Sequence, residues 1–531
     1  MSLAREQVFI RKSSGLTRQI SAWDALMYCS MNPGLLWPFI YMWWGTYAYP
    51  GAHMTWATLG VLVIVPIAAL YWLFSVAMPR SGGEYVYVSR ILHPTLGLVV
   101  SWTLSIILLF WSGQILNWAV RWGLIYMLKG VSMANGNTVL AGLADMLNHP
   151  NPRAILGTIL MALLFYVLIR GAKWVMRLSW VAVISSLATI VVFGVAAAKS
   201  GAAAFAANFQ QMTGVSTDAV VQAAQAAGFP LAPTVAMTIM AAFTYVGLNT
   251  LGSTLSANVA GEIRGVQKSQ AVALFGSLLV IMVMWAALYG IMYGTWGYKF
   301  VNALAWAYST GAPVYPLAGY EPFPVLLVTY MVKSPVFPVL LGIGWFICAF
   351  AVPVGVAYAA TRNMFAWAFD RMIPPSWTEV GTRFRAPWRV ILAATLIAEF
   401  FLLLDVYFPA WTALSGFSIM SWFLAWAILG VAGIVFPYRR RDLFDAAPPI
   451  VRSKFLGVPV ITLLGVFMTV ANLATVWFIL NPFFRGVLPY TIIVVTLIIM
   501  VLPVFLWVFS TWYYGRRGIP IHLQFQQVPP E

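Results

Sequence analysis

Charged side chains are the scarcest feature of this sequence. Asp, Glu, Lys and Arg make up 8% of the 531 residues, whereas hydrophobic residues make up 62%. The mean hydropathy is +0.85. Such a composition lies far outside the range of ordinary soluble domains. The lack of charge therefore excludes a soluble protein and predicts an integral membrane protein.

Cysteine and histidine are also rare, and this limits the chemistry that we expect. The two cysteines, Cys29 and Cys348, lie in apolar runs, so we expect no extracellular disulfide framework. The four histidines lie at the ends of apolar runs or in loops, and no HExxH, GxSxG or paired-Asp motif is present. A membrane-embedded enzyme would need such groups at depth, and a channel would need a filter or charged ring. We therefore expect no enzyme, metal or cofactor.

What the sequence has instead is a series of apolar runs of about 20 residues, the length that crosses a bilayer. We predict an all-α protein with twelve transmembrane helices. No cleavable signal peptide is expected, because the first 19 residues are polar and basic, so the first span directs insertion. The predicted spans are 21–45, 55–78, 95–127, 154–171, 175–198, 233–260, 269–293, 336–368, 388–406, 411–436, 457–480 and 487–513.

The basic residues indicate how these spans are oriented. The chain has 30 Lys and Arg against 14 Asp and Glu, a net charge of +16. With a cytoplasmic N-terminus, 23 of the 30 fall on the cytoplasmic side. Lys and Arg concentrate on that side of membrane proteins, so both termini are predicted in the cytoplasm of a plasma-membrane protein. The excess therefore reports topology and contact with anionic lipid, and we expect no nucleic-acid partner.

The first predicted span contains a helix-breaking segment, "CSMNPGLLW", residues 29–37. In hydrocarbon, a break survives only where protein or a water-filled cavity satisfies the freed backbone groups. Asn32 is a favoured helix N-cap and Pro33 suits a first helical position, so we predict a second half-helix from Pro33. Its N–H groups would attract a carboxylate, and the carbonyls before the break an ammonium. A proline kink repaired by neighbouring helices is the alternative.

A second interruption is predicted in span 6, where Gly247, Asn249, Gly252 and Ser253 lie midway. Paired breaks in corresponding positions are typical of transporters built from inverted repeats. Spans 1 and 6 are five spans apart, so the second unit would cross the membrane in the opposite direction. We therefore predict a five-plus-five inverted repeat, with spans 11 and 12 appended. Small residues for close helix packing are the alternative.

Four segments resemble the amino acid–polyamine–organocation (APC) transporter superfamily and together cover about residues 16 to 445. The resemblance implies transport of an amino acid, amine or related solute by alternating access. Two departures concern the ligand: Ser30 to Gly34 replace the usual Gly-x-Gly, and Asn249 replaces a frequent acidic residue, which weakens the case for a cationic ligand. The segments are "MPRSGGEYVYVSRILHPTLG" (78–97), "FTYVGLNTLGSTLSANVAGEIR" (243–264), "ATRNMFAWAFDRMIPPSWTEVGTRFRAPW" (360–388) and "FPYRRRDLF" (436–444).

We accordingly predict a transport core with its substrate site at the two breaks. The predicted divisions are a cytoplasmic tail (1–20), a ten-helix core (21–436), a cytoplasmic loop with helices 11 and 12 (437–513), and a second cytoplasmic tail (514–531). Ser30, Asn32 and Gly34 would contact the carboxylate, and Tyr245, Gly247 and Asn249 the amino group or side chain. The predicted substrate-binding residues are Ser30, Met31, Asn32, Pro33, Gly34, Phe243, Tyr245, Gly247, Leu248 and Asn249.

Few ionisable residues are available for gating or coupling. Intramembrane charges are functional candidates by default, but Asp24 and Arg121 lie near span ends, where snorkelling or a salt bridge is the favoured explanation. We predict inner-gate ion pairs of Glu262 with Arg264 and of Glu84 with Arg80 and Arg90; solvated surface charge is the alternative. The full set of gating or coupling candidates is Asp24, Arg80, Glu84, Arg121, Glu262, Arg264 and Glu399.

The coupling ion and the outer segments stay open at this point. Span 8 has no Ser or Thr within "GWFICAFAVPVGVAYAA", so sodium coupling is not expected, whereas proton symport and exchange both remain. The aromatic segment 294–335 is expected to pack over an outer vestibule or to form a plain amphipathic loop. An amine, polyamine or organic-acid transporter of the same fold and a non-transporting sensor are the alternatives to an amino acid transporter.

Overall fold

The computed structural model describes residues 17–317, 319–381, 386–408, 416–480 and 489–526. The start of predicted spans 10 and 12, most of the N-terminal tail and the end of the C-terminal tail lie outside these residues. The side chain of Leu248 also lies outside them.

The described chain is almost entirely helical. Its first half contains α2 (Ala22–Met31), α3 (Pro38–Ala48), α4 (Met54–Ala57), the 3₁₀ turn η2 (Thr58–Gly60), α5 (Val61–Ala77), α6 (Gly83–Ile91), α7 (Pro94–Trp118), the π-helix η3 (Ala119–Ile125), α8 (Tyr126–Asn135), α9 (Thr138–Leu147), α10 (Pro150–Ile169), α11 (Ala172–Thr213) and α12 (Thr217–Ala226).

The second half begins with the predicted sixth span. It contains α13 (Val235–Ala241), the π-helix η4 (Ala242–Gly247), α14 (Leu248–Thr250), the 3₁₀ segments η5 (Leu251–Asn258) and η6 (Ala260–Glu262), α15 (Val266–Trp296), α16 (Tyr298–Thr310), α17 (Pro324–Met331), α18 (Val336–Phe369), η7 (Pro375–Thr378), α19 (Trp388–Tyr407), α21 (Gly416–Arg439), α22 (Arg441–Ala446), the hairpin strands β1 (Lys454–Phe455) and β2 (Val458–Pro459), α23 (Val460–Leu480), α24 (Pro489–Gly515) and η8 (Ile521–Phe525).

Eleven helical segments of the described chain are long and apolar enough to cross a membrane. They match predicted spans 2 to 12 in order. The first predicted span is not among them because it is divided into α2 and α3, and neither half is long enough alone. The protein is therefore an all-α, multi-pass membrane protein, while the count of twelve and the inverted repeat remain predictions.

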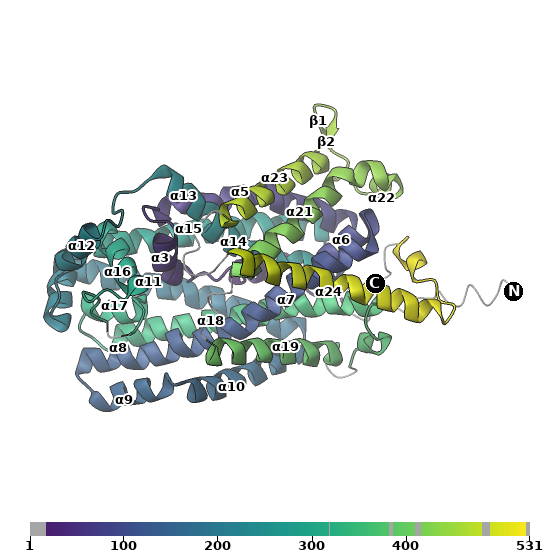
Figure 1. Cartoon of the computed structure of the whole chain (residues 1–531). Coiled ribbons are helices and arrows are strands. Elements are labelled where there is room, and N and C mark those ends of the chain that lie inside the picture. The colour runs from purple at the N-terminus through teal and green to yellow at the C-terminus, as the bar shows by residue number, and fades with distance from the viewer. Residues whose placement is uncertain (1–16, 318, 382–385, 409–415, 481–488, 527–531) are drawn as a thin grey trace.

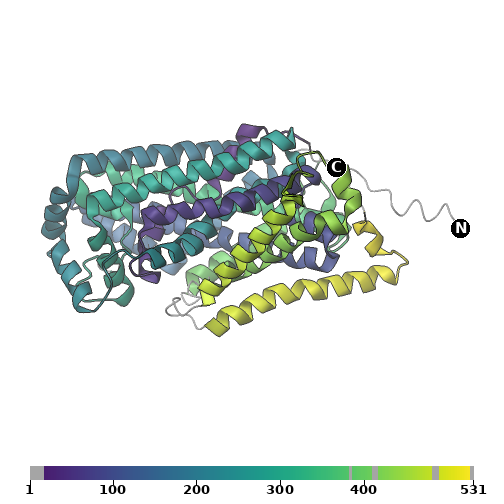
Figure 2. The ribbon, with the colours of Figure 1, turned by 90° about the horizontal axis from the view of Figure 1, so that it is seen from above.

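The long helices run roughly along one direction, and α24 lies at the edge of the bundle (Figure 2). Buried residues make up 78% of the apolar stretch in α7 and 72% of that in α18, but only 22% in α24. The first two helices therefore form the middle of the protein, and α24 is a peripheral helix that presents its surface to lipid. Helices α12, α16 and α17 gather at one end of the bundle (Figure 1).

The outer segments contain more helix than the sequence indicates. Helix α11 continues past the predicted end of span 5, with one interruption at Gly201, where φ is 65° and ψ is 171°. The aromatic segment 294–335 folds into α16 and α17, with Phe300, Leu304 and Tyr330 buried. It is therefore a packed layer of short helices and not a plain loop.

Span 1 is interrupted as predicted, but the second half-helix begins later. Asn32 ends α2 with helical φ and ψ and donates its N–H to the Tyr28 carbonyl, and α3 begins only at Pro38. Gly34 causes the delay because it takes a left-handed φ of +72° that turns the chain before the helix restarts. The predictions that Asn32 caps the second half and that Pro33 begins it are wrong.

Span 6 changes its helix type and does not unwind. It passes from the π-helix η4 through one α-helical turn to the 3₁₀ segments η5 and η6. Ser253 does not cap a new half-helix, because its Oγ donates to the Thr250 carbonyl at 2.6 Å. π-Helical turns and mid-helix 3₁₀ stretches are frequent at functional sites and hinges. The predicted break is thus a local change of winding within a continuous helix.

Spans 1 and 6 touch where both depart from regular α-helix. A Cβ atom on Gly252 would lie 2.7 Å from the carbonyl carbon of Asn32 and 2.8 Å from the nitrogen of Pro33. On the other side, a Cβ on Gly355 of α18 would lie 2.0 Å from Asn32 Oδ1. Glycine at both positions therefore allows two spans to enclose the interrupted segment.

This contact predicts that Gly252→Ala lowers stability by about 1–3 kcal/mol, the usual cost of overpacking. The added methyl group would meet backbone atoms, which cannot rotate away. The measurement is the unfolding temperature of the purified protein in detergent. Gly290→Ala in α15 is the matched control, because no atom lies within 4 Å of its added Cβ. Equal unfolding temperatures for the two variants would contradict the close approach.

Candidate functional site

A small cavity lies at the contact between spans 1 and 6. Its volume is about 50 Å³. Since each water needs roughly 10–15 Å³ of such space, it holds only a few water molecules. The lining comes from five spans: Asn32, Trp37 and Tyr41 in span 1; Leu108, Trp111, Ile115 and Trp118 in α7; Asn249, Gly252 and Leu255 in span 6; Val352 and Val356 in α18; and Trp422 in α21. None of these residues is charged.

Asn32 is the most unusual polar group of this lining. It is 5% exposed, and neither Oδ1 nor Nδ2 makes a hydrogen bond of good geometry, although the Tyr28 hydroxyl lies beside the amide. Leaving a buried polar group unsatisfied costs about 1–3 kcal/mol, so most such groups in native proteins are paired. Ser30 Oγ, two residues earlier, is likewise buried without a partner. Within the described residues, this part of span 1 thus has buried donors and acceptors that make no hydrogen bond of good geometry.

The other amide of the cavity, Asn249, is fully engaged. Its Oδ1 accepts from the Tyr41 hydroxyl at 2.7 Å, and its Nδ2 donates to the Tyr245 carbonyl at 2.6 Å. The Tyr41 and Tyr245 rings lie 5.4 Å apart. Asn249 therefore holds α3 against span 6 and presents a tyrosine edge to the cavity.

Backbone groups freed by the break face α18. The Leu35 and Leu36 N–H groups point toward the thiol of Cys348. The Cys29 carbonyl would bond residue 33 in a continuous helix, but Pro33 has no N–H. Cys29 lies beside Ser256 of η5. Neighbouring spans thus partly satisfy the freed groups, as burial in lipid demands.

Aromatic rings cover one side of the cavity. Trp37 stacks on Trp345 with centroids 5.1 Å apart, and Trp118 lies 5.1 Å from Trp122. Trp122 in turn stacks on Phe323, which precedes α17. These contacts form a closed aromatic layer between the cavity and the short helices α16 and α17. We call this layer the outer cover.

An ion pair lies beside the outer cover. Arg121, in the π-helix η3, pairs with Glu321 at 2.7 Å, and Trp122 Nε1 donates to the same carboxylate at 3.4 Å. Burial raises the pKa of Glu321 and the Arg121 charge lowers it, with burial the larger effect. The predicted candidate Arg121 is therefore tied to the segment before α17, through a partner that the sequence did not reveal.

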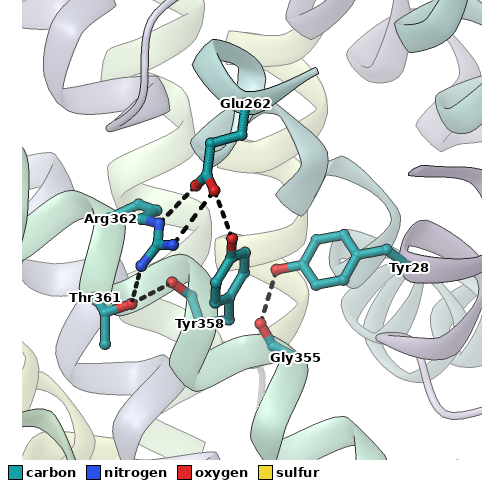
Figure 3. Close-up of polar contacts among 6 residues, drawn as sticks. All are labelled: Tyr28, Glu262, Gly355, Tyr358, Thr361 and Arg362. Carbon is teal, nitrogen blue, oxygen red and sulfur yellow. Dashed lines mark hydrogen bonds and ion pairs between the residues drawn. The ribbon is translucent and has the colours of Figure 1, made fainter. Parts of the chain in front are cut away.

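A buried polar network lies around Glu262, at the end of span 6 (Figure 3). Arg362 of α18 pairs with Glu262 at 2.7 Å, and the two side chains are 1% and 2% exposed. Tyr358 donates to Glu262 at 2.9 Å, and Tyr28 of α2 donates to the Gly355 carbonyl at 2.7 Å. These contacts, which we call the inner network, join span 1, the end of span 6 and α18.

The predicted partner of Glu262 is wrong. Arg264 donates instead to the Arg18 carbonyl at 3.0 Å. The Glu262 carboxylate is taken instead by Arg362 of α18, and Ile263 between the two predicted partners has extended φ and ψ. The Ile20 N–H bonds the Glu262 carbonyl, and the Arg264 N–H bonds the Ile20 carbonyl, in a short parallel bridge. The end of span 6 is thus also tied to the start of span 1.

The predicted pairing of Glu84 is also wrong. Arg90 pairs with Asp370 at 2.7 Å, and Arg80 donates to the Pro79 carbonyl at 3.0 Å. Glu84 is 1% exposed and is held by neutral partners. Helix α6 is short, so residues 84 and 90 lie more than one turn apart and reach different neighbours.

Two further candidates lie away from the cavity. Asp24 forms a capping box with Ser21 and accepts from Trp180 Nε1 at 3.0 Å, which gives it a helix-capping role. Glu399 of α19 accepts from Thr158 of α10 at 2.5 Å, and its Oε2 is buried without a partner. Asp405, which the sequence analysis did not single out, accepts from Gln114 and Asn117 of α7.

The structure brings together only part of the predicted substrate site. Asn32 and Asn249 line the cavity. Pro33 and Gly34 belong to the interrupted segment that follows Asn32, and Ser30 and Met31 form the last residues of α2 before it. Tyr245 packs behind Tyr41, whereas Phe243 packs on Phe478 of α23 at 5.6 Å, away from the cavity. Their contact with a substrate stays a prediction.

The tryptophans of the cavity were missed, although a signal existed. Leu108, Trp111, Ile115 and Trp118 are spaced by three and four residues and so share one face of α7. Such a stripe is common in any packed helix, and the sequence does not show that this face meets an interrupted span. Trp422 of α21, which stacks on Trp111 at 5.2 Å, had no signal in its own segment.

Comparison with known proteins gives one match. A model of the family described as amino acid permease matches residues 39–503. No curated protein sequence matches the chain. The matched range includes most of the cavity lining, the outer cover apart from Trp37, and the inner network apart from Tyr28.

From the inner network we predict that a single variant loses much more stability than the double variant. Arg362→Met leaves the buried Glu262 carboxylate unpaired and should cost about 3–5 kcal/mol, whereas the combined Glu262→Gln and Arg362→Met variant should cost much less. Thermal unfolding in detergent of the two single variants, Arg362→Met and Glu262→Gln, and of the double variant measures this. Additive losses would show that the two side chains do not form a buried pair.

Proposed function

The chain belongs to the amino acid permease family, and on this premise we propose that it moves an amino acid or a related small zwitterion across the plasma membrane by alternating access. Membership of the family, together with the apolar helices, makes the protein a membrane transporter. The observation that carries the finer proposal is the cavity at the break of span 1, lined by the buried amide of Asn32, which makes no hydrogen bond of good geometry.

The chemistry of the cavity favours a ligand with no net charge. Its lining holds no carboxylate and no basic side chain, so a polyamine or a dicarboxylate would be buried without a counter-charge. The carboxylate of a zwitterion could instead accept from Asn32 Nδ2 and from the freed N–H groups. Its ammonium group could donate to Asn32 Oδ1 and to the freed carbonyls. The tryptophan and aliphatic side chains would then contact its apolar part.

The two closed layers around the cavity support alternating access. The outer cover lies between the cavity and the helices α16 and α17, and the inner network lies at the end of span 6, around Glu262. At about 50 Å³ the cavity is smaller than an amino acid requires, so binding needs one layer to open. Because the inner network joins spans 1, 6 and 8, movement of these spans relative to one another would break it. We therefore assign Glu262 and Arg362 to the inner gate and Arg121 to the outer one.

A transport assay with a panel of substrates tests the proposal. In proteoliposomes, neutral amino acids should compete for uptake of a labelled neutral amino acid, while polyamines and dicarboxylic acids should not. The panel is repeated with imposed proton and sodium gradients and with unlabelled amino acid inside. Dependence on the proton gradient selects symport, and stimulation by internal amino acid selects exchange. Saturable binding without flux would identify a sensor and contradict transport.

Asn32→Leu should weaken substrate recognition at similar side-chain volume. An unpaired polar group costs about 1–3 kcal/mol, so the concentration for half-maximal uptake should rise about tenfold or more. Gln222→Leu, on the exposed outer helix α12, is the control and should leave uptake unchanged. An unchanged half-maximal concentration in Asn32→Leu would remove Asn32 from the binding site.

A further inference from the structure

A second buried carboxylate lies near the inner network without a cation. Glu84 is in the first turn of α6, outside the membrane-spanning helices, and is 1% exposed. The Tyr71 hydroxyl of α5 donates to its Oε1 at 2.5 Å, and Asn258 Nδ2 of η5 donates to its Oε2 at 2.7 Å. Buried carboxylates are usually paired with a cation, because burying an unpaired charge is costly.

The charged groups around Glu84 are engaged elsewhere in the described chain. Within α6, Arg90 pairs with Asp370, the residue that follows α18. On α18, Arg362 pairs with Glu262.

The remaining neighbours contribute polar or aromatic groups. Arg80, just before α6, donates to the Pro79 carbonyl. Tyr87 of α6 shares a hydrogen bond with Ser75 at 3.1 Å, and Tyr85 of α6 faces Arg90 and Asp370. From α21, Trp426 packs on the Tyr71 ring with centroids 5.6 Å apart. The partners of the Glu84 carboxyl in the described structure are therefore neutral.

Glu84 also lies at a junction that must move if the inner side opens. The Gly82 N–H bonds the Asn258 carbonyl at 2.9 Å, and a Cβ on Gly83 would lie 2.8 Å from Asn258 Nδ2. Asn258 Nδ2 also donates to Asn363 Oδ1 of α18 at 2.9 Å, and Asn363 donates to Ser105 of α7 at 3.0 Å. One carboxyl group thus ties α5 and α6 to the end of span 6, and through it to α18 and α7.

We propose that Glu84 is the proton-binding residue of the transport cycle, which holds a proton while the inner side is closed and releases it to the cytoplasm when that side opens. The proposal rests on the transport function proposed above. In the neutral acid the proton on Oε1 is donated to the Tyr71 oxygen across the 2.5 Å contact, so that the Tyr71 hydroxyl rotates and becomes the acceptor, while Oε2 keeps accepting from Asn258. The neutral acid therefore fits the hydrogen bonds of the closed arrangement.

The direction of this coupling follows from linkage. Burial raises the pKa of Glu84, and the hydrogen bonds from Tyr71 and Asn258 offset this only in part. Opening would admit water and return the pKa toward its ordinary value. A proton favours the state in which the group's pKa is higher, so protonation stabilises the closed inner side and ionisation favours opening. Release to the cytoplasm should accordingly become easier as the cytoplasmic pH rises.

Proton movement during uptake tests this proposal directly. Proteoliposomes with a trapped pH dye take up the labelled amino acid selected by the competition panel. In the unmodified protein, uptake should acidify the lumen and be accelerated by an inward proton gradient. Glu84→Gln should retain exchange of internal for external amino acid but lose both the acidification and the acceleration. Glu379→Gln, an exposed cytoplasmic carboxylate paired with Arg389, is the matched control and should behave like the unmodified protein.

The outcomes separate this inference from the proposed function. Lumen acidification that persists in Glu84→Gln overturns the assignment of Glu84. Uptake by the unmodified protein without acidification also overturns it, while the transport proposal stands. No uptake of any amino acid by the unmodified protein overturns the transport proposal itself.

A second variant covers the case in which Glu84→Gln does not fold. Asn258→Ala removes a donor that stabilises the carboxylate more than the acid, so the pKa of Glu84 should rise further. The lumenal pH for half-maximal uptake should then move upward by about one unit. An unmoved midpoint, in a variant that elutes as a single species from a sizing column, overturns the proposal.

Discussion

The arrangement depends on one physical constraint, which is that hydrocarbon offers no hydrogen-bond partner to a peptide group. Span 1 stops being a helix between Asn32 and Pro38, and the groups freed there must be enclosed by other parts of the chain. Gly252 and Gly355 allow spans 6 and 8 to come close enough to do this. The enclosure is incomplete at Asn32, and the cavity lies there.

Because charged residues are scarce, the buried acidic side chains are few and each has an identifiable structural role. With 14 acidic residues in the chain, those that are buried mark points where separate spans are joined. Glu262 joins the end of span 6 to α18, and Glu321 joins the segment before α17 to the π-helix of span 3. A buried pair adds little net stability, but its loss on one side is costly. Such ion pairs are therefore suited to contacts between spans in which both partners separate, or meet, at the same time.

The sequence predicted positions better than partners. The interruption of span 1 is confirmed because Asn-Pro-Gly disfavours continuous helix whatever surrounds it. The start of the second half-helix was wrong, because the left-handed turn at Gly34 and the ring of Trp37 determine where winding resumes. Span 6 stays wound, since its small residues permit several helix types and packing against Asn32 selects among them. The partners of Glu262 and Glu84 were wrong for a similar reason: their contacts lie 100 or 174 residues away.

The sequence by itself determined that this protein lies in a membrane and is helical. It also determined the order of the spans and the point where the first span is interrupted. Those properties depend on composition, on runs of apolar residues and on the local backbone limits of proline and glycine. Tertiary structure alone decided which polar groups are satisfied and which are not. Asn32 and Asn249 are the same residue type in similar apolar segments, yet only Asn249 forms well-aligned hydrogen bonds, with the Tyr41 hydroxyl and the Tyr245 carbonyl. That difference arises from contacts between distant spans, which no local pattern records.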